Sequence, residues 1–382
     1  MINMEEKKLG IYLHIPFCKQ KCYYCDFPSF AGQEACQEDY LDTLLLEIRK
    51  VGAKYQDRIV DTIFVGGGTP SILPADALPR VLDEVRAFFA VDAQAEITAE
   101  ANPGTVDSHK LSRWHEAGMN RISFGVQSFH DTLLQAIGRI HTGEEAQMAV
   151  RMAREAGFAN INLDLIYGLP GQTLDMLKQD VMEAIALEIE HLSVYGLIVE
   201  EDTLLERMVD DGRAILPREE EEEAMYDWIT AYLPQQGYHR YEISNYARAG
   251  RECRHNLKYW QFDEYIGLGS AAHSFAGRKR LANERIPSDY IRRMHADGSA
   301  CLSEETETIA ELQGEYIFLA LRTTQGVDTE DFCHTFGADF FALHGDIIER
   351  MKNERLLEQA GRYIRLTELG MKYGNRVFAQ FV

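Results

Sequence analysis

The 382-residue sequence has no long apolar run, and its first nine residues are charged rather than hydrophobic. A membrane-spanning helix needs about 18 or more mostly apolar residues, and a secretory signal peptide needs an apolar core of about 7 to 15. We see neither of these segments. We therefore expect a cytoplasmic protein, with peripheral contact to a membrane left open.

The sequence also has fewer basic than acidic residues. The chain has 39 Lys and Arg against 61 Asp and Glu, a formal net charge of −22. A general nucleic-acid binder needs a basic face to neutralise phosphates. We therefore expect no nucleic-acid partner, while a local basic pocket for a small anion stays compatible with this composition.

Cysteine is scarce except in one stretch. The chain has seven, an odd number with uneven spacing, which fits a reducing compartment better than a disulfide framework. Three of them fall within eight residues, Cys18-Lys-Gln-Lys-Cys22-Tyr-Tyr-Cys25. Thiolates select iron–sulfur clusters, zinc or copper(I), and a zinc site usually adds a distant second pair that we do not find. We predict a [4Fe-4S] cluster on Cys18, Cys22 and Cys25, with one iron left open. We interpret Cys36, Cys301 and Cys333 as structural.

The first half of the chain alternates short β-rich runs with helical patterns. Strands are predicted over residues 11–15, 62–65, 96–100, 121–126, 160–166 and 191–197. Apolar spacing predicts helices over residues 40–48, 78–88, 111–118, 144–157 and 174–187. This alternation predicts an α/β fold with a parallel sheet and crossover helices. Periodicity alone fits an open doubly wound sheet and a barrel equally well.

Beyond residue 198 the alternation weakens. A run of five glutamates, residues 219–223, suits the start of a solvated helix, and a partner-binding acidic patch is the alternative. Helices are predicted over residues 289–295, 308–323 and 341–349, followed by a hairpin at 357–366 and a last helix from Thr367. We expect a large domain, residues 1–285, and a small C-terminal helical domain, residues 286–382.

Polar residues gather at the ends of the predicted strands. Glu100, Gln127 and Asp164 lie at or beyond carboxyl ends, as does the loop Gly66-Gly-Gly-Thr-Pro70. Ligands of parallel α/β folds bind at that edge. The loop matches neither a dinucleotide nor a Walker motif, and glycines there let backbone approach a ligand closely. A plain tight turn is the alternative.

Two further polar features point to the same edge. Asn160, Asn162 and Asp164 share one face of a strand, which is costly unless that face lines a site or forms a satisfied buried network. Arg139, in the loop after the fourth strand, is suited to bidentate pairing with a carboxylate.

Together these stretches resemble the radical S-adenosylmethionine (SAM) family, in its coproporphyrinogen-oxidase-like branch. The matching stretches are Ile11-Tyr-Leu-His-Ile-Pro-Phe-Cys18, Cys22-Tyr-Tyr-Cys25-Asp-Phe27, Gly66-Gly-Gly-Thr-Pro70, Glu100-Ala-Asn-Pro-Gly104, Gly125-Val-Gln-Ser128, Gly138-Arg-Ile-His141, Asp164 with Gly168-Leu-Pro170, and His255-Asn-Leu-Lys-Tyr-Trp260. The resemblance implies a partial (β/α)6 barrel of the TIM type and a small winged-helix-like C-terminal domain. It also implies that SAM occupies the open iron, in a site lined by Tyr12, Tyr24, Gly67, Gly68, Thr69, Glu100, Gln127, Arg139 and Asp164.

Two departures bear on activity. The oxidase carries a further cysteine where this chain has Phe27, and a longer arm precedes its barrel, whereas only eleven residues precede Tyr12 here. Both favour a chaperone branch, which the resemblance implies binds heme and delivers it to heme-dependent respiratory proteins. A radical enzyme that decarboxylates coproporphyrinogen III is the main alternative, and a zinc-binding structural module is a third.

The residues themselves give a modest case for heme at His255. It lies beside Cys253 and Arg254, with Tyr259 and Trp260 following. An imidazole can ligate heme iron, a basic residue can meet a propionate, and aromatic rings can cover the macrocycle. With the resemblance, we predict His255 as the heme ligand and His273 as the second choice. The heme-accepting protein and a homodimer are left open.

Overall fold

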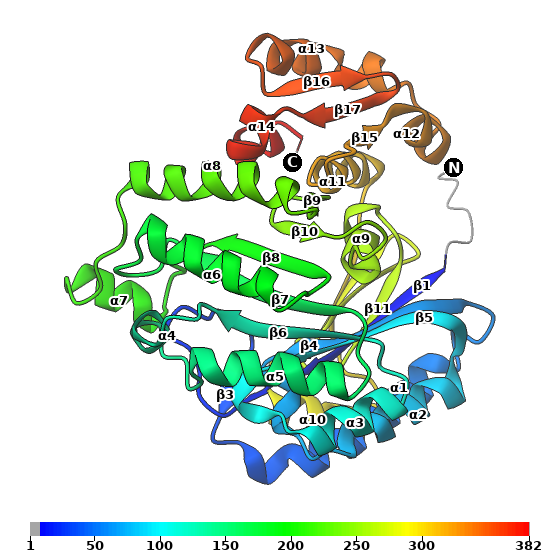
Figure 1. Ribbon diagram of the computed structural model, residues 1–382. Coiled ribbons are helices and arrows are strands. Elements are labelled where there is room, and N and C mark those ends of the chain that lie inside the picture. Colours follow the sequence, from blue (N-terminus) through cyan, green and yellow to red (C-terminus); the bar gives the residue numbers. More distant parts are fainter. Residues whose placement is uncertain (1–7, 382) are drawn as a thin grey trace.

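The computed structural model describes residues 8–381 (Figure 1). The expectation that there is no signal peptide concerns residues that lie mostly outside this range. Within it, no helix is both long enough and apolar enough to cross a bilayer.

Six parallel strands form the centre of the structure. They are β1 (Leu9–Ile15), β4 (Ile59–Gly67), β5 (Ala90–Ala101), β6 (Arg121–Gln127), β7 (Ile161–Tyr167) and β8 (His191–Gly196). Each pairs in parallel with the one before it, so their order in the sheet is their order in the chain. A doubly wound sheet instead reverses its order at a switch point. The structure therefore confirms all six strands and the partial barrel.

Helices cover the outer face of these strands (Figure 1). They are α1 (Gln37–Gly52), α2 (Ala77–Phe88), α3 (Ser108–Glu116), α5 (Gly143–Glu155) and α6 (Leu174–Ala186), all at predicted positions. Their apolar stripes explain this arrangement. On α2, Leu78, Val81 and Val85 are fully or almost fully buried and belong to the same core as the strand side chains. The helices therefore bury one face and leave the carboxyl ends of the strands uncovered.

The barrel is open, because further strands extend both of its edges. On one side β8 pairs with β10 (Asn245–Ala247), which pairs with β9 (His239–Arg240). On the other, β1 pairs with β11 (Tyr265–Leu268), and the sheet continues through β12 (His273–Ala276), β13 (Lys279–Asn283) and β14 (Cys301–Thr306). β1, which pairs with β4 on one side and β11 on the other, is therefore an interior strand of the sheet.

A smaller unit with its own apolar core follows. It comprises α11 (Ile309–Ala320), β15 (Val327–Asp328), α12 (Thr329–Phe336), α13 (Phe340–Asn353), β16 (Leu357–Ala360), β17 (Tyr363–Leu366), α14 (Glu368–Lys372) and α15 (Gly374–Phe378). The hairpin and the long helices are as predicted, whereas α12 is additional.

The segment before this unit belongs to the barrel. β14 completes the large sheet, and α10 (Pro287–Asp297) packs on α1, where the Tyr290 hydroxyl donates to Glu47 Oε2 at 2.8 Å. The boundary at residue 286 stays a prediction, and we propose a division after Thr306 instead.

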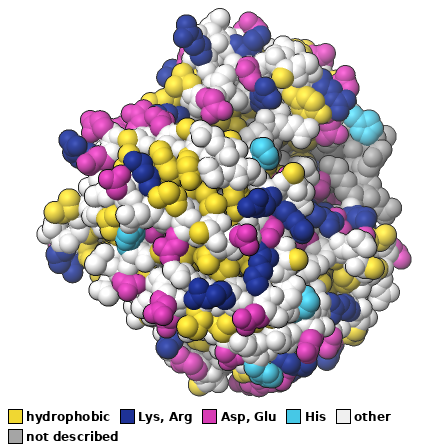
Figure 2. Space-filling model, in the orientation of Figure 1, with side chains coloured by type: hydrophobic (Ala, Val, Ile, Leu, Met, Phe, Trp, Pro, Cys, Tyr) yellow, Lys and Arg dark blue, Asp and Glu magenta, His cyan; other side chains and the backbone are white. Residues whose placement is uncertain are grey.

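The glutamate run begins α8 (Glu219–Gln235), as expected of a helix start. Lys372 of the small unit pairs with Glu223 at 2.5 Å and Asp227 at 3.0 Å, so α8 also contacts that unit. On the face drawn in Figure 2, basic side chains are mixed with acidic ones rather than gathered into one broad surface of the kind that nucleic acid requires.

Candidate functional site

A cavity of about 420 Å³ lies at the carboxyl ends of the parallel strands. Its wall includes every predicted site residue except Tyr12 and His255. These are Cys18, Cys22, Tyr24, Cys25, Gly67, Gly68, Thr69, Glu100, Gln127, Arg139 and Asp164. The structure thus brings together residues from five strands and the loops after them, at the edge where a barrel of this type binds its ligands.

The cysteine loop is held by backbone contacts on both sides. β2 (Phe17–Cys18) pairs with β3 (Phe30–Ala31), and the Tyr23 N–H donates to the Ile137 carbonyl oxygen at 3.0 Å. Gly138 has φ +73°, and a Cβ there would lie 2.6 Å from the Tyr23 ring. The tyrosine therefore docks against a glycine that the chain needs at this turn, and the three cysteines are presented on a fixed loop.

Two side chains donate hydrogen bonds to the thiols. Thr69 Oγ1 lies 3.4 Å from Cys18 Sγ, and Arg139 Nη1 lies 3.4 Å from Cys22 Sγ. Burial raises the pKa of the third thiol, Cys25. A hydroxyl from the glycine loop and a cation from the loop after β6 are therefore aimed at two of the three sulfurs.

The spacing of the thiols bears on the kind of metal group. Among residues 8–381, no three His, Cys, Asp or Glu side chains converge closely enough to hold one metal ion. Zinc needs its thiolates at about 2.3 Å from a single point. In a cubane cluster each cysteine binds a different iron, so the sulfurs need not converge. Three thiols around one cavity therefore suit a cluster better than a zinc ion.

The glycine loop leaves no room for side chains. Gly67 has φ +110°, and a Cβ on it would lie 2.6 Å from the His14 ring. A Cβ on Gly68 would lie 2.7 Å from the Phe17 carbonyl oxygen. The loop is therefore packed against the cysteine-bearing segment as part of the cavity wall, which is more than a plain tight turn requires.

Two half-buried carboxyl groups face the cavity. Asp164 accepts hydrogen bonds from Asn162 Nδ2 at 2.8 Å and from Ser123 Oγ at 3.3 Å. Burial, reinforced by the charge of Asp164, raises the pKa of Glu100 to about 8, although the Gly67 N–H donates to it at 3.2 Å. Glu100 therefore holds its proton at neutral pH and can donate a hydrogen bond. On the polar face of this strand, Asp164 lines the cavity, whereas Asn162 belongs to a buried hydrogen-bond network with Ser123 and His191.

A β-bulge directs Gln127 into the cavity. The register of β6 against β7 shifts between Gly125 and Gln127, and Gln127 has φ +68°, an uncommon conformation outside glycine. Two side chains from the following loop hold this backbone. Arg139 Nη2 donates to the Gly125 carbonyl oxygen, and His141 Nε2 lies 3.1 Å from the Val126 carbonyl oxygen.

Sequence reasoning did not single out His141. The sequence feature that could have indicated it is its position two residues after Arg139, because side chains two positions apart share one side of an extended segment. His141 is 3% exposed, and burial lowers its pKa to about 3. The neutral ring therefore donates from Nε2.

Tyr12 lies behind the cavity and does not line it. Its ring stacks on Phe64 with centroids 6.3 Å apart, and its hydroxyl lies 3.0 Å from His14 Nδ1. His14 Nε2 in turn lies 3.0 Å from the carbonyl oxygen of Pro28 in the cysteine loop. The tyrosine thus supports the loop through a histidine.

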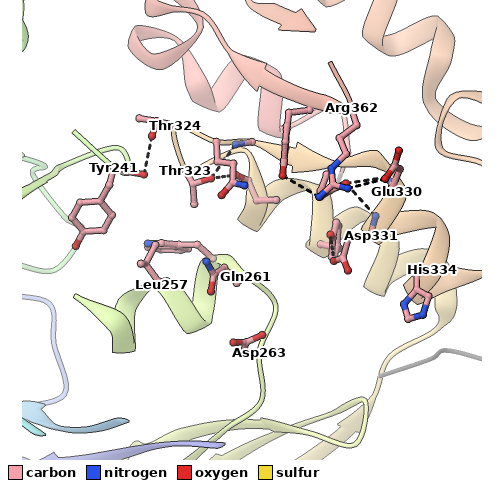
Figure 3. Close-up of a pocket in the computed structure, with 17 residues that line it drawn as sticks. Tyr241, Leu257, Gln261, Asp263, Thr323, Thr324, Glu330, Asp331, His334 and Arg362 are labelled. Carbon is pink, nitrogen blue, oxygen red and sulfur yellow. Dashed lines mark hydrogen bonds and ion pairs between the residues drawn. The ribbon is translucent and has the colours of Figure 1, made fainter. Parts of the chain in front are cut away.

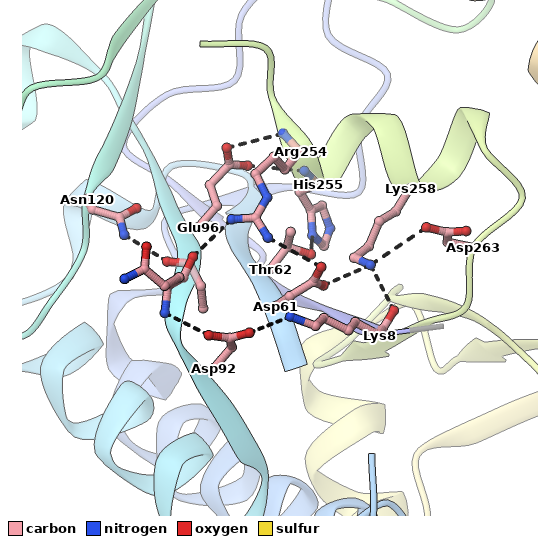
Figure 4. A network of polar contacts seen from close by, with 12 residues as sticks. Lys8, Asp61, Thr62, Asp92, Glu96, Asn120, Arg254, His255, Lys258 and Asp263 are labelled. Atoms are coloured by element: carbon pink, nitrogen blue, oxygen red, sulfur yellow. Dashed lines mark hydrogen bonds and ion pairs between the residues drawn. The ribbon is translucent and has the colours of Figure 1, made fainter. Parts of the chain in front are cut away.

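His255 lies at the other end of the barrel, on α9 (Arg254–Trp260) (Figure 4). Thr62 Oγ1 lies 2.9 Å from its Nδ1, and the Tyr259 hydroxyl lies 2.9 Å from its Nε2. The side chain is 1% exposed, and burial lowers its pKa to about 3. Both ring nitrogens are committed, so the structure does not bring His255 to the cavity or leave it a position for iron.

The rest of α9 closes the amino-terminal end of the barrel. Lys258 Nζ lies 2.8 Å from Asp61 Oδ1 and 2.8 Å from the Lys8 carbonyl oxygen (Figure 4). The Glu96 carboxylate accepts from the backbone N–H groups of Arg254 at 3.2 Å and His255 at 3.1 Å. In this structure, the motif around His255 holds the helix against the ends of the strands. His273, at the start of β12, is exposed instead.

Comparisons with known proteins agree with this architecture. The Radical SAM superfamily model matches residues 12–184, and the HemN C-terminal domain model matches residues 311–372. The heme chaperone HemW of Bacillus subtilis (strain 168) is 38% identical over 97% of this chain and 98% of its own. That of Escherichia coli (strain K12) is 44% identical over 98% of each.

The chain belongs to the HemW family of radical SAM proteins. The solved structure of HemN, the coproporphyrinogen III oxidase of Escherichia coli, matches it with a TM-score of 0.88 at 24% identity. That match covers 98% of this chain and 90% of the other, and shows the same fold. In this HemW-family chain, the radical SAM match spans the elements that build the cavity up to α6.

Proposed function

We propose that this protein is a heme chaperone that binds heme and passes it to a heme-dependent protein. The observation that carries the proposal is the match of 38% and 44% identity to HemW proteins over nearly the whole chain. An intact cavity of the radical SAM type supports it. We also propose a cytoplasmic location, with the heme-accepting protein as partner.

The cavity residues fit a [4Fe-4S] cluster held by Cys18, Cys22 and Cys25, with SAM beside it. Three thiols and no fourth cysteine in the wall leave one iron to a non-protein ligand. The cluster would supply a single electron and an open coordination position. Arg139 and Thr69 would stabilise the thiolates, and the protonated Glu100 would donate a hydrogen bond to a ligand.

The rim of the cavity suits the flat apolar face of a porphyrin. Phe27, Tyr195 and Ile198 line it and are 63%, 39% and 66% exposed. Large apolar side chains left open around a polar site are typical of ligand contact. We propose that heme rests against this rim.

The iron ligand is a separate question. His255 remains the histidine that the resemblance favours, and its use requires Thr62 and Tyr259 to release the ring. His273 is exposed and needs no such release.

The test is anaerobic cluster reconstitution followed by heme titration, with absorbance reporting heme ligation. The purified protein should bind heme, and His255→Ala and His273→Ala are compared in parallel. Loss of the ligated spectrum in one variant identifies the ligand, and unchanged spectra in both remove both histidines. Failure of the reconstituted protein to bind heme would refute the chaperone proposal.

Oxidative decarboxylation of coproporphyrinogen III is the second candidate, because the fold matches HemN and every residue predicted for the cluster lines the cavity. An anaerobic assay with SAM and coproporphyrinogen III decides it. The vinyl product with deoxyadenosine would favour the oxidase. Absence of both products, with cluster and SAM shown to be bound, would exclude it.

A further inference from the structure

The crevice between α9 and the C-terminal unit illustrates how this chain pairs its charges. There, Arg362 bridges Asp328 at 2.8 Å and Glu330 at 2.7 Å (Figure 3). One cation inside the barrel does not follow this pattern. It is Arg121, the first residue of β6.

Arg121 is buried without a partner. It is 2% exposed, and its Nε lies in the interior with no hydrogen-bond acceptor. Among residues 8–381, its guanidinium forms no hydrogen bond and no ion pair. A buried charge in this state is strongly destabilising, and such departures are retained mainly at functional sites. Arg121 is therefore a candidate for a role beyond holding the fold.

The barrel interior around Arg121 is polar. Thr98 lies opposite it on β5, and Ser123 pairs with Asn162 at the next level towards the cavity. All of these side chains are buried, whereas barrels of the TIM type usually fill this space with branched apolar residues. Ser123 and Asp164 reach the wall of the cysteine cavity. A polar column therefore joins Arg121 to the floor of that cavity.

Two carboxyl groups face Arg121. Glu96 lies towards the amino-terminal end of the barrel, and Asp164 lies towards the cavity. The other titratable side chains that face it are uncharged at neutral pH, because burial raises the pKa of a thiol or phenol and lowers that of an imidazole. They are Cys253, Tyr241, His191 and His255. The charge of Arg121 is therefore balanced by Glu96 and Asp164.

Glu96 has direct donors of its own. Its carboxylate accepts from the backbone N–H groups of Arg254 at 3.2 Å and His255 at 3.1 Å, at the start of α9 (Figure 4). These two bonds explain why Glu96 is placed where it is. They leave open what the charge of Arg121 does at the cavity end.

Asp164 receives its direct hydrogen bonds from neutral side chains. Asn162 Nδ2 donates at 2.8 Å and Ser123 Oγ at 3.3 Å. Ser123 lies two positions after Arg121 and therefore on the same face of β6, so Arg121 lies next to the network that holds Asp164. Burial raises the pKa of Asp164, and the charge of Arg121 opposes that rise.

Other titratable groups also face Asp164. Glu100 of β5 is protonated at neutral pH, and Arg139 directs its hydrogen bonds to the cysteine loop and to the β6 backbone. Two phenols are neutral because burial raises their pKa. They are Tyr24 and Tyr195. Of the described cations that face Asp164, Arg121 is therefore the one with no bonding partner of its own.

We propose that Arg121 is a positioning residue of the SAM site, whose buried charge keeps Asp164 ionised as a hydrogen-bond acceptor. Glu100 keeps its proton and donates, so the cavity presents one donor and one acceptor from two carboxyl groups. The partner of Asp164 is a hydroxyl or amine of SAM. This role rests on the SAM site proposed above, and it assigns part of the SAM affinity to a residue that does not line the cavity.

The test is calorimetric titration of SAM into the reconstituted full chain from about pH 6 to about pH 8.5. Arg121→Met should bind SAM at least about tenfold more weakly than the wild type at the acidic end. It should approach the wild type at the alkaline end, because Asp164 then ionises unaided. Arg121→Lys keeps the charge and should restore most of the affinity. Arg113→Met, which removes an exposed positive charge on α3, should match the wild type throughout.

Two further comparisons separate this role from a merely structural one. Repeating the titrations in Glu100→Gln removes the contribution of that second carboxyl group, and the pH dependence should persist. In Asp164→Asn, adding Arg121→Met should cost no further affinity, because no ionised group remains to be held. Urea denaturation of the cluster-free chain gives a readout without SAM, in which the same two substitutions should be non-additive at neutral pH.

The outcomes are distinguishable. Failure of the wild type to bind SAM would count against the SAM site itself. With SAM bound by the wild type, four results would each overturn the role of Arg121: unchanged affinity in Arg121→Met, a loss that is equal at every pH, a lysine variant as weak as the methionine variant, or additivity with Asp164→Asn.

Discussion

Glu100→Gln tests the half-buried carboxyl group of Glu100 in the cavity. The native state holds a protonated Glu100, with a pKa of about 8, while the unfolded chain releases that proton near a pKa of 4.5. The native state therefore binds more protons between these two pH values, and stability falls as pH rises through that window. Glutamine mimics the protonated group at every pH.

Each pKa unit is worth about 1.4 kcal/mol, so between pH 5 and pH 8 the wild-type protein should lose about 3 kcal/mol relative to Glu100→Gln. Urea denaturation of the cluster-free chain at several pH values measures the free energy of unfolding. The difference in free energy of unfolding between Glu100→Gln and the wild type should grow in favour of the variant as pH rises. In the control Glu155→Gln, which changes an exposed side chain, the free energy of unfolding should depend on pH as it does in the wild type. Parallel curves for Glu100→Gln would refute the argument.

Three further substitutions test other parts of the structure. Lys258→Met should lower the free energy of unfolding in urea by about 2 kcal/mol, because it removes a buried ammonium and leaves the half-buried Asp61 with Arg254 as its one remaining cation among the described residues. Lys178→Met, which breaks an exposed pair, should cost less than about 1 kcal/mol. His141→Ala should weaken SAM binding in calorimetry, because it removes the contact that holds the β6 bulge, and His141→Gln should restore the affinity. Equal SAM affinities in the wild type and both variants would count against that role. Cys25→Ser should lose the cluster absorbance and most of the iron after reconstitution, while Cys36→Ser, outside the cavity, should keep both; iron loss in both variants would argue against the assignment.

The barrel strands and covering helices could be predicted because their patterns are long and regular. Leu78, Val81 and Val85 repeat at helical spacing, and the strand of Asn162 and Asp164 alternates polar and apolar residues. The choice between a barrel and a doubly wound sheet could not come from periodicity, because both use the same repeat. Strand pairing decides it, and pairing is a non-local property.

The short strands β9 to β14 escaped prediction for a related reason. Strands of two to six residues, such as β9 and β12, are too brief for a period to show, and they depend on partners far along the chain. The site residues likewise could be predicted only where a local sequence pattern marks them. Residues at strand ends, such as Glu100, could be placed from sequence, whereas the support from His141 depends on a bulge that no pattern announces.

His255 illustrates the limit most clearly. A histidine beside arginine and aromatic residues has the same composition in a ligand site and in a helix anchor. The distinction comes from Thr62 and Glu96, which lie about 190 and 160 positions away in the chain and reach α9 only when the barrel forms.

The position of β1 inside the sheet has a consequence for synthesis on the ribosome. β1 pairs with β11, and the Lys258 contact to the Lys8 carbonyl oxygen joins residues 250 positions apart. At about 5–20 residues per second, the edge of β1 that faces β11 waits roughly 10 to 50 seconds for its partner to emerge. During that interval the nascent chain has most of its barrel but still exposes one unpaired edge of β1. That edge is covered only when β11 and α9 have been synthesised and pack against the first strand.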